Sequence, residues 1–154
     1  MTYTAHHPRH HTRILIACAC ALALATGVAL AGSSANPQGE TVLPKADLKF
    51  ENINPAIKMA AAYGDKSKSG HGTFGKFPAN FQTPFHTHSG AYHGVVLKGV
   101  MANPFKGEAN PPKMEAGSYW HVPANSVHAT ACVSDTPCEF YFHADAPFDF
   151  HPAE

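Results

Sequence analysis

The sequence is poor in charge, which excludes several classes of protein. Charged residues make up 14% of the chain, with 11 Lys plus Arg against 11 Asp plus Glu. It has no basic stripe of the kind that nucleic acid needs, so we predict no nucleic-acid partner. It also lacks a long amphipathic helical pattern, which argues against a helical bundle.

Common catalytic motifs are missing as well. The chain contains no G-x-S-x-G, P-loop or H-E-x-x-H run. Residues 70–75 (GHGTFG) fit G-x-G-x-x-G, but they lack the strand, helix and acidic residue of a dinucleotide-binding unit. We interpret this stretch as a glycine-rich hairpin.

Residues 1–31 have the features of an export signal. Arg9 and Arg13 precede an apolar run over 14–31, which ends in an Ala-x-Ala cleavage pattern. The alternative is an uncleaved membrane anchor, since the run is just long enough to span a bilayer. Its alanine-rich composition and small-residue end favour cleavage. We therefore predict a periplasmic or secreted protein with no stable membrane anchor after cleavage.

The remaining chain suits one domain. Cleavage would remove both Arg and leave nine Lys against eleven acidic residues, a formal charge of −2. Residues 32–46 are polar and contain Gly and Pro, so we predict a flexible linker or arm there. Residues 47–154 are long enough to bury a single core.

Short strands separated by turns dominate the predicted domain. In residues 57–63, one set of side chains (Ile57, Met59, Ala61 and Tyr63) alternates with another (Lys58, Ala60 and Ala62), which favours a strand, although the run MAAA also suits a helix. Many short strands with Gly, Pro and Asn turns predict an all-β barrel or jelly roll. The other expected strands lie at 73–77, 91–101, 118–122, 127–133 and 139–144.

Two of the four cysteines lie beyond the predicted signal. Cys132 and Cys138 flank a short loop, and in an oxidising compartment we expect a disulfide between them. Two free thiols are the alternative. Cys132 as a metal ligand is disfavoured, because it lies about 13 Å along a straight strand from His128.

Four histidines suggest a metal site. His86 and His88 lie two residues apart, so on a strand they point to the same face. His93 and His128 follow them. Neutral imidazole is the commonest protein ligand for borderline transition metals. We therefore expect one divalent transition metal ion.

Residues 80–99 and 117–132 resemble the two sequence motifs of the cupin superfamily. The first motif is G-x5-H-x-H-x(3–4)-E-x6-G, and the second is G-x5-P-x-G-x2-H-x3-N. His86, His88 and His128 fall on three of the metal-ligand positions. The resemblance implies a double-stranded β-helix, or jelly-roll barrel, with a metal held by these residues.

The chain departs from the motifs at several positions. His93 stands where the family has a ligand Glu, and Cys132 takes the final Asn position. Asn80 replaces the opening Gly. Asn125 replaces a Gly of the second motif, where Asn can also adopt the left-handed conformation. Most of the mature chain resembles small, uncharacterised secreted cupins.

Strand alternation predicts which side chains face the site. Lys98 should face solvent, so His93 on the other face of that strand should point inward, as a ligand or behind the ligands. Tyr92 should line the core or pocket. Other candidates for the pocket or for positions behind the ligands are His121, Tyr141 and His143, with solvent exposure as the alternative for the last two.

Sequence alone leaves the activity open. Cupins include dioxygenases, isomerases, decarboxylases, storage proteins and sensors, so the resemblance implies no substrate. We expect an exported metal-binding single-domain cupin, and one hypothesis for its activity is a metal-dependent enzyme, dioxygenase- or lyase-like, acting on a small organic molecule. A non-catalytic metal- or ligand-binding module of the cell envelope and a metal-free structural barrel are the alternatives. Zinc is the first candidate ion, with iron, copper, manganese or nickel as others, and the resemblance allows a homodimer.

Overall fold

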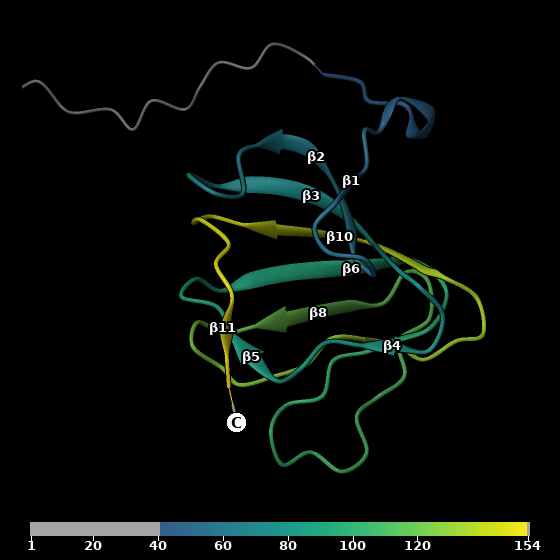
Figure 1. Ribbon diagram of the computed structural model, residues 1–154, viewed down its shortest axis with the longest axis vertical. Helices are drawn as coiled ribbons and strands as arrows, with labels where there is room; N and C mark the ends of the chain where they lie inside the picture. The colour runs from purple at the N-terminus through teal and green to yellow at the C-terminus, as the bar shows by residue number, and fades with distance from the viewer. Residues whose placement is uncertain (1–40, 154) are drawn as a thin grey trace, which may run out of the picture. The chain divides into compact units, whose positions relative to one another are not determined.

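The computed structural model describes residues 41–153, which form antiparallel strands and one short 3-10 helix (Figure 1). The predicted signal at 1–31 and most of the predicted arm lie outside the described residues. Among the described residues, no helix has the length and apolarity needed to cross a membrane. The elements are η1 (Lys45–Asp47), β1 (Glu51–Asn52), β2 (Lys58–Gly64), β3 (His71–Phe77), β4 (Phe81–Gln82), β5 (His86–Thr87), β6 (Tyr92–Lys98), β7 (Met101–Ala102), β8 (Tyr119–Val122), β9 (Ala131–Cys132), β10 (Cys138–Ala144) and β11 (His151–Pro152).

The strands form one large sheet and two small ones. The large sheet has the order β1-β2-β3-β10-β6-β8, so β10, late in the chain, lies between β3 and β6 (Figure 1). The small sheets have the orders β4-β9-β7 and β11-β5. The all-β prediction is confirmed. Residues 58–64 form a strand and not the rival helix, because pairing with β3 on one side and β1 on the other outweighs the helical propensity of the alanines.

The core lies on one face of the large sheet. Along β10 the burial alternates, with Cys138, Phe140, Phe142 and Ala144 buried and the residues between them half-buried. The buried Trp120 packs across Gly94 on the neighbouring strand, where an added Cβ would lie 2.1 Å from the indole. Glycine at this position is therefore a packing requirement.

Two asparagines have left-handed backbone conformations. Asn80 has φ 55° and Asn125 has φ 60°, and both stand where the cupin motifs have glycine. Asn is one of the few residues that adopts this conformation at small cost. The turn at Asn125 is joined to the residue that follows β5, because the N–H of Asn125 donates to the carbonyl of His88 at 2.8 Å.

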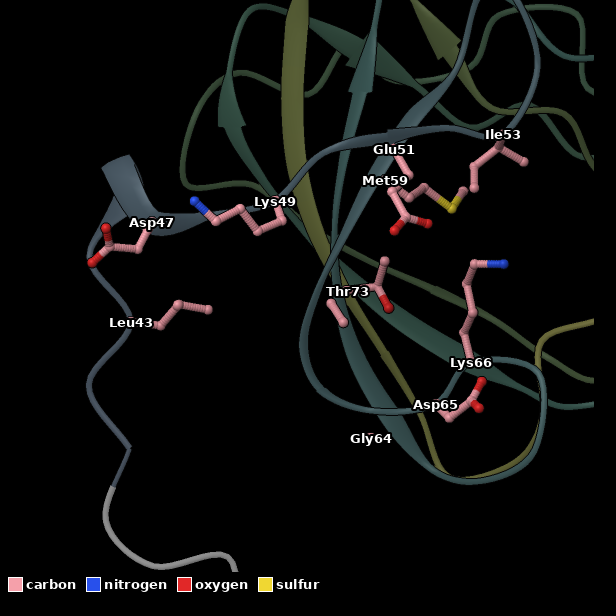
Figure 2. Close-up of a pocket in the computed structure, with 11 residues that line it drawn as sticks. Leu43, Asp47, Lys49, Glu51, Ile53, Met59, Gly64, Asp65, Lys66 and Thr73 are labelled. Carbon is pink, nitrogen blue, oxygen red and sulfur yellow. The ribbon is translucent and has the colours of Figure 1, made fainter.

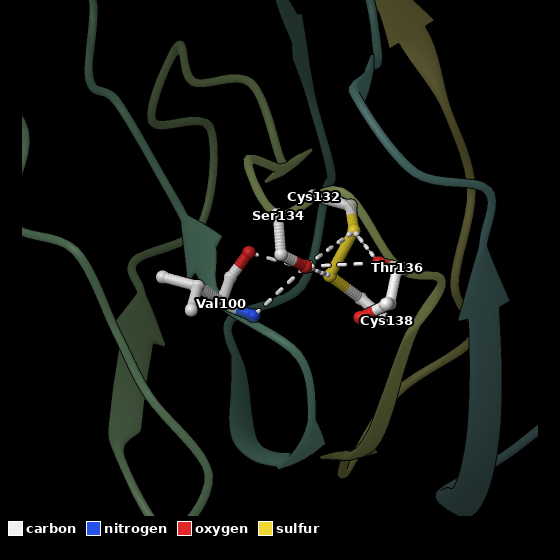
Figure 3. Close-up of a disulfide and its surroundings, with 5 residues drawn as sticks. All are labelled: Val100, Cys132, Ser134, Thr136 and Cys138. Carbon is white, nitrogen blue, oxygen red and sulfur yellow. Dashed lines mark hydrogen bonds between the residues drawn. A yellow bond between two sulfur atoms is a disulfide. The ribbon is translucent and has the colours of Figure 1, made fainter.

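A disulfide joins Cys132 at the end of β9 to Cys138 at the start of β10 (Figure 3). Ser134 lies inside this loop. Its hydroxyl donates to the carbonyl of Thr136 at 2.9 Å and accepts from the N–H of Val100 at 3.2 Å. The disulfide and Ser134 together tie the β9–β10 loop to the beginning of β7.

The end of the predicted arm contacts the barrel. The Lys45 ammonium lies 2.7 Å from the Glu139 carboxylate on β10. Lys45 is largely exposed, so this ion pair contributes little to stability.

Reduction should measure the contribution of the disulfide. The chain-entropy model gives a loop of this length about 2 kcal/mol, so dithiothreitol should lower the free energy of urea unfolding by about that amount. The control is the double variant Cys132→Ser, Cys138→Ser, which should not respond to the reductant. An unchanged wild-type unfolding curve would show that the disulfide contributes nothing to stability.

Candidate metal centre

Strand pairing brings three histidines together. The backbones of His86 and His128 exchange both hydrogen bonds, at 2.9 and 3.0 Å, as an antiparallel pair. Directly opposed residues have their side chains on the same face. His88 lies two residues beyond His86 and joins the same face.

The three rings converge in the interior. One imidazole nitrogen from each of His86, His88 and His128 lies within 4.8 Å of the others. Within residues 41–153, these three histidines are the one group of side chains that could hold a metal ion. The Nε2 atoms of His86 and His88 are 3.1 Å apart. All three residues are buried, with His128 fully so.

Backbone carbonyls determine which nitrogen of each ring is free. The Nδ1 of His86 donates to the carbonyl of Pro84 at 2.8 Å, and that of His128 donates to Ser126 at 2.9 Å. The Nδ1 of His88 donates to the carbonyl of Asp149. A carbonyl only accepts, so Nδ1 bears the proton and Nε2 presents its lone pair to the centre. Metal-binding histidines are oriented in this way.

This donor set fits a metal ion. Two Nε2 lone pairs facing each other at 3.1 Å repel unless a proton or cation lies between them. Metal–nitrogen bonds of about 2.0–2.1 Å would place neighbouring ligand nitrogens about 3.0–3.4 Å apart. Imidazole donors suit zinc, copper, iron and nickel. The spacing of His86 and His88 and the chemistry of all three donors therefore fit a transition metal.

Burial keeps the ligands neutral. Desolvation lowers the pKa of His86, and it lowers the pKa of both His88 and His128 to about 4. The carbonyl hydrogen bonds to Nδ1 oppose this shift but do not cancel it. The lone pairs thus remain available for a metal well below neutral pH.

A buried phenol adjoins the cluster. The hydroxyl of Tyr92 lies 3.1 Å from Nε2 of His128 and donates to it, since Nδ1 of that ring already bears the proton. An ion bound at this Nε2 would take the same lone pair and leave the hydroxyl free to donate to another group. Burial raises the pKa of Tyr92 to about 12, so the hydroxyl stays protonated. Tyr92 also lines a small cavity beside His86 and His88.

Two aromatic rings from the C-terminal segment cover the histidines. Phe148 stacks on His88 with ring centroids 3.9 Å apart, and Phe150 stacks on His86 at 4.4 Å. Strand β11 adds to β5, the strand of the ligands, and holds this segment in place. Phe148 and Phe150 were not among the site residues predicted from the sequence. The signal in the sequence was the alternation of apolar and polar side chains over residues 148–150, directly before the strand His151–Pro152, which is typical of a strand with one buried face.

His93 lies elsewhere, and its predicted inward position is wrong. The residue is exposed on β6, where buried Tyr92, Gly94 and Val96 form the inner face. Its ring stacks on His121, at 4.5 Å between centroids. The prediction used Lys98 to orient the strand. That residue lies beyond a register shift at the end of β6, past the last pair with β8, and is exposed for that reason.

Three other candidates also face away from the cluster. His121 is exposed on β8, next to His93, and not in the pocket. Tyr141 and His143 are half-buried on the outer face of β10. The Nδ1 of His143 lies 2.6 Å from the hydroxyl of Tyr63. His121 and His143 share the outer face with His93 because both are paired with it on the neighbouring strands. Alternation along a single strand did not predict which face of the sheet these residues occupy.

A family model identifies the chain's relatives. Residues 42–154 match the family described as Domain of unknown function (DUF4437). The chain belongs to this family. No curated protein matches the chain.

Solved structures share the fold of this DUF4437 protein. The polyketide cyclase RemF from Streptomyces resistomycificus has a TM-score of 0.65 at 16% identity, over 75% of this chain and 87% of that one. An RmlC-like cupin from Shewanella frigidimarina has 0.58 at 16%, over 70% and 92%. A predicted oxalate decarboxylase from Thermotoga maritima has 0.59 at 17%, over 69% and 99%. The cupin fold expected from the sequence motifs is confirmed.

Metal content should depend on the inner histidines. We expect protein purified without chelator to contain one equivalent of a transition metal, by elemental analysis. His128→Ala should lower this content, and His128→Ala with His86→Ala should abolish it, because loss of two of three ligands leaves too few donors. The matched control is His93→Ala on the outer face, which should keep full stoichiometry. Unchanged content in the double variant would refute the site.

The metal-free protein should lose stability in mild acid. The pKa of His88 and of His128 is about 4 in the folded state, below the ordinary value of 6.5. As pH falls below 6.5, the unfolded state binds protons first, and the folded state is disfavoured down to about pH 4. Urea unfolding between about pH 7 and pH 5 should show a loss of roughly 1–2 kcal/mol for each histidine.

The control for this acid effect is the variant His88→Asn, His128→Asn. It should have a flatter pH dependence because neither replacement titrates in this range. An equal loss of stability in this variant would assign the acid sensitivity to other groups.

Proposed function

We propose that this protein is a metal-dependent enzyme, dioxygenase- or lyase-like, that acts on a small organic molecule. The observation that supports this most is the convergence of three buried imidazoles, two of which (His86 and His88) line a small cavity of about 70 Å³. A shell of four protein ligands would be closed, as in structural zinc sites, whereas three leave a position for water or substrate. The outward position of His93 favours three.

Each residue of the cluster has a distinct part in this proposal. His86, His88 and His128 would hold the ion through Nε2, and the carbonyls of Pro84, Ser126 and Asp149 keep the rings oriented. When bound, the ion would act as a Lewis acid and acidify a bound water. The protonated hydroxyl of Tyr92 can donate to an oxygen of the substrate.

Apolar side chains surround the cluster. Ile57, Met59, Phe148 and Phe150 line the small cavity beside His86 and His88. A low-dielectric surrounding strengthens the attraction between the ion and an anionic substrate group. A polyketide cyclase and a predicted oxalate decarboxylase have the same fold, so it can support reactions on small molecules.

We further propose that the protein acts in the periplasm or is secreted. The signal-like residues 1–31 motivate this, and the disulfide Cys132–Cys138 is of the kind that persists in oxidising compartments. Outside the cytoplasm the order of metal affinities favours copper and zinc over iron and manganese, and zinc remains our first candidate. The alternative function is a non-catalytic metal- or ligand-binding module of the cell envelope.

Cobalt substitution separates the two functions. In the enzyme, we expect the cobalt form to show a solvent molecule that a small anion such as azide displaces, seen as a shift of the visible bands. The physical reason is the coordination position that three ligands leave open. The same protein, reconstituted with each candidate metal, should then turn over at least one member of a panel of dicarbonyl and phenolic compounds.

Two results would contradict the enzyme proposal. A cobalt spectrum that azide does not change would indicate a closed shell and favour the binding module. Oxygen uptake and substrate loss that stay at background for every metal would also count against catalysis. In that test His128→Ala is the inactive control and His93→Ala is the control expected to behave as wild type.

A further inference from the structure

A larger pocket adjoins the cavity at the histidines. Its volume is about 460 Å³, within the range of small-molecule sites. It shares five lining residues with the small cavity, so the two spaces adjoin: Ile57, Met59, Thr83, Phe148 and Phe150. A molecule in the larger pocket would therefore contact the two phenyl rings that stack on His86 and His88.

The walls of this pocket suit a flat apolar group. Phe81, Phe148 and Phe150 provide three aromatic rings, and Ile53, Ile57 and Met59 add apolar surface. Phe150 is 48% exposed although its ring stacks on a metal-site histidine. A planar ligand resting on this ring would cover apolar surface that water now contacts.

Most polar side chains of the pocket already have partners. The side-chain carbonyl of Asn54 accepts from the N–H groups of Ala56 and Ile57, both at 2.8 Å. The hydroxyl of Thr83 accepts from the N–H of Thr130 at 2.9 Å. The carboxylate of Asp149 accepts from the N–H of Ser89 at 2.8 Å and lies 3.0 Å from His151.

Lys66 is the exception among the polar lining residues. Its side chain is half-buried and forms no ion pair with an acidic group of the described residues. Figure 2 shows the Lys66 side chain extending toward Ile53 and Met59. These three residues line both this pocket and a neighbouring hollow of about 490 Å³. Asp65, also in that hollow, is paired with Lys68 at 2.8 Å.

The backbone of Lys66 is held against the C-terminal segment. Its carbonyl accepts from the N–H of Phe148 at 2.7 Å. The loop after β2 and the residues that cover the histidines are therefore joined. This bond fixes the backbone from which the Lys66 side chain extends along the pocket rim.

We propose that this pocket binds a small aromatic carboxylate. The ring lies against Phe148 and Phe150, and the carboxylate accepts hydrogen bonds from the Lys66 ammonium. The ring is then one phenyl layer away from His88 and His86, on which Phe148 and Phe150 stack. The inference rests on the proposed function, because it names the substrate class for the same site. Its distinctive claim is the role of Lys66 as the residue that selects an anion.

The experiment compares two probes of similar size by isothermal titration calorimetry. Benzoate has the ring and the carboxylate, and benzyl alcohol has the ring without the charge. The protein is the metal-containing form purified from an exporting host. We expect benzoate to bind at least about tenfold more tightly than benzyl alcohol, since hydrogen bonds between charged groups are the stronger kind.

Substitutions at Lys66 test the assignment directly. Lys66→Met keeps the apolar stem and should weaken benzoate by about tenfold or more while leaving benzyl alcohol unchanged. Lys66→Arg keeps the charge and should retain the preference for benzoate. The matched control is Lys68→Met, which removes an exposed lysine already paired with Asp65 and should change neither affinity.

Two results would overturn the inference. One is a Lys66→Met protein that binds benzoate as tightly as wild type. The other is a wild type that binds neither probe, or binds both equally. Metal content is measured on the same samples, so failure of the metal site is seen separately. Benzoate binding that depends on Lys66 in a protein that takes up no metal would support the pocket and count against the proposed metal function.

Discussion

The structure depends on the position of three uncharged imidazoles whose lone pairs point at one another inside an apolar barrel. Backbone pairing between His86 and His128 brings two of them together, and the two-residue repeat of a strand adds His88. Three backbone carbonyls, one for each ring, accept from Nδ1 and so leave the Nε2 lone pair of each ring directed inward. Such an arrangement is unfavourable without a cation, because the Nε2 lone pairs of His86 and His88 face each other at 3.1 Å with no donor between them. This is the physical reason for assigning a metal to the site.

The C-terminal segment completes this centre. The carbonyl of Asp149 orients His88, while Phe148 and Phe150 stack on the rings of His88 and His86. The same segment is held by β11 against β5 and by the carbonyl of Lys66. Orientation of the ligands, exclusion of water and the wall of the larger pocket therefore come from one short stretch of chain. A change in this stretch would affect all three together.

Much of the fold was predictable because local signals agreed. Alternating burial on β10, a strand over residues 58–64 and asparagines able to adopt positive φ all follow from properties of single residues or of neighbours. The orientation of β6 was not predictable in this way. Lys98 was expected to mark the outer face, but a register shift beside it breaks the alternation on which that argument relied. The error moved His93 from the inner face to the outer one.

The sequence alone determined the all-β class, the pairing of His86 with His88 on one face and the match of His128 to a ligand position, because strand periodicity and motif spacing are local properties. Only the tertiary structure decided that His93 lies outside the cluster, that Phe148 and Phe150 cover it and that Lys66 faces the adjoining pocket. These facts depend on strand register and on contacts between segments distant in the chain. Both are set by how the whole barrel buries its apolar surface, and no local pattern encodes them.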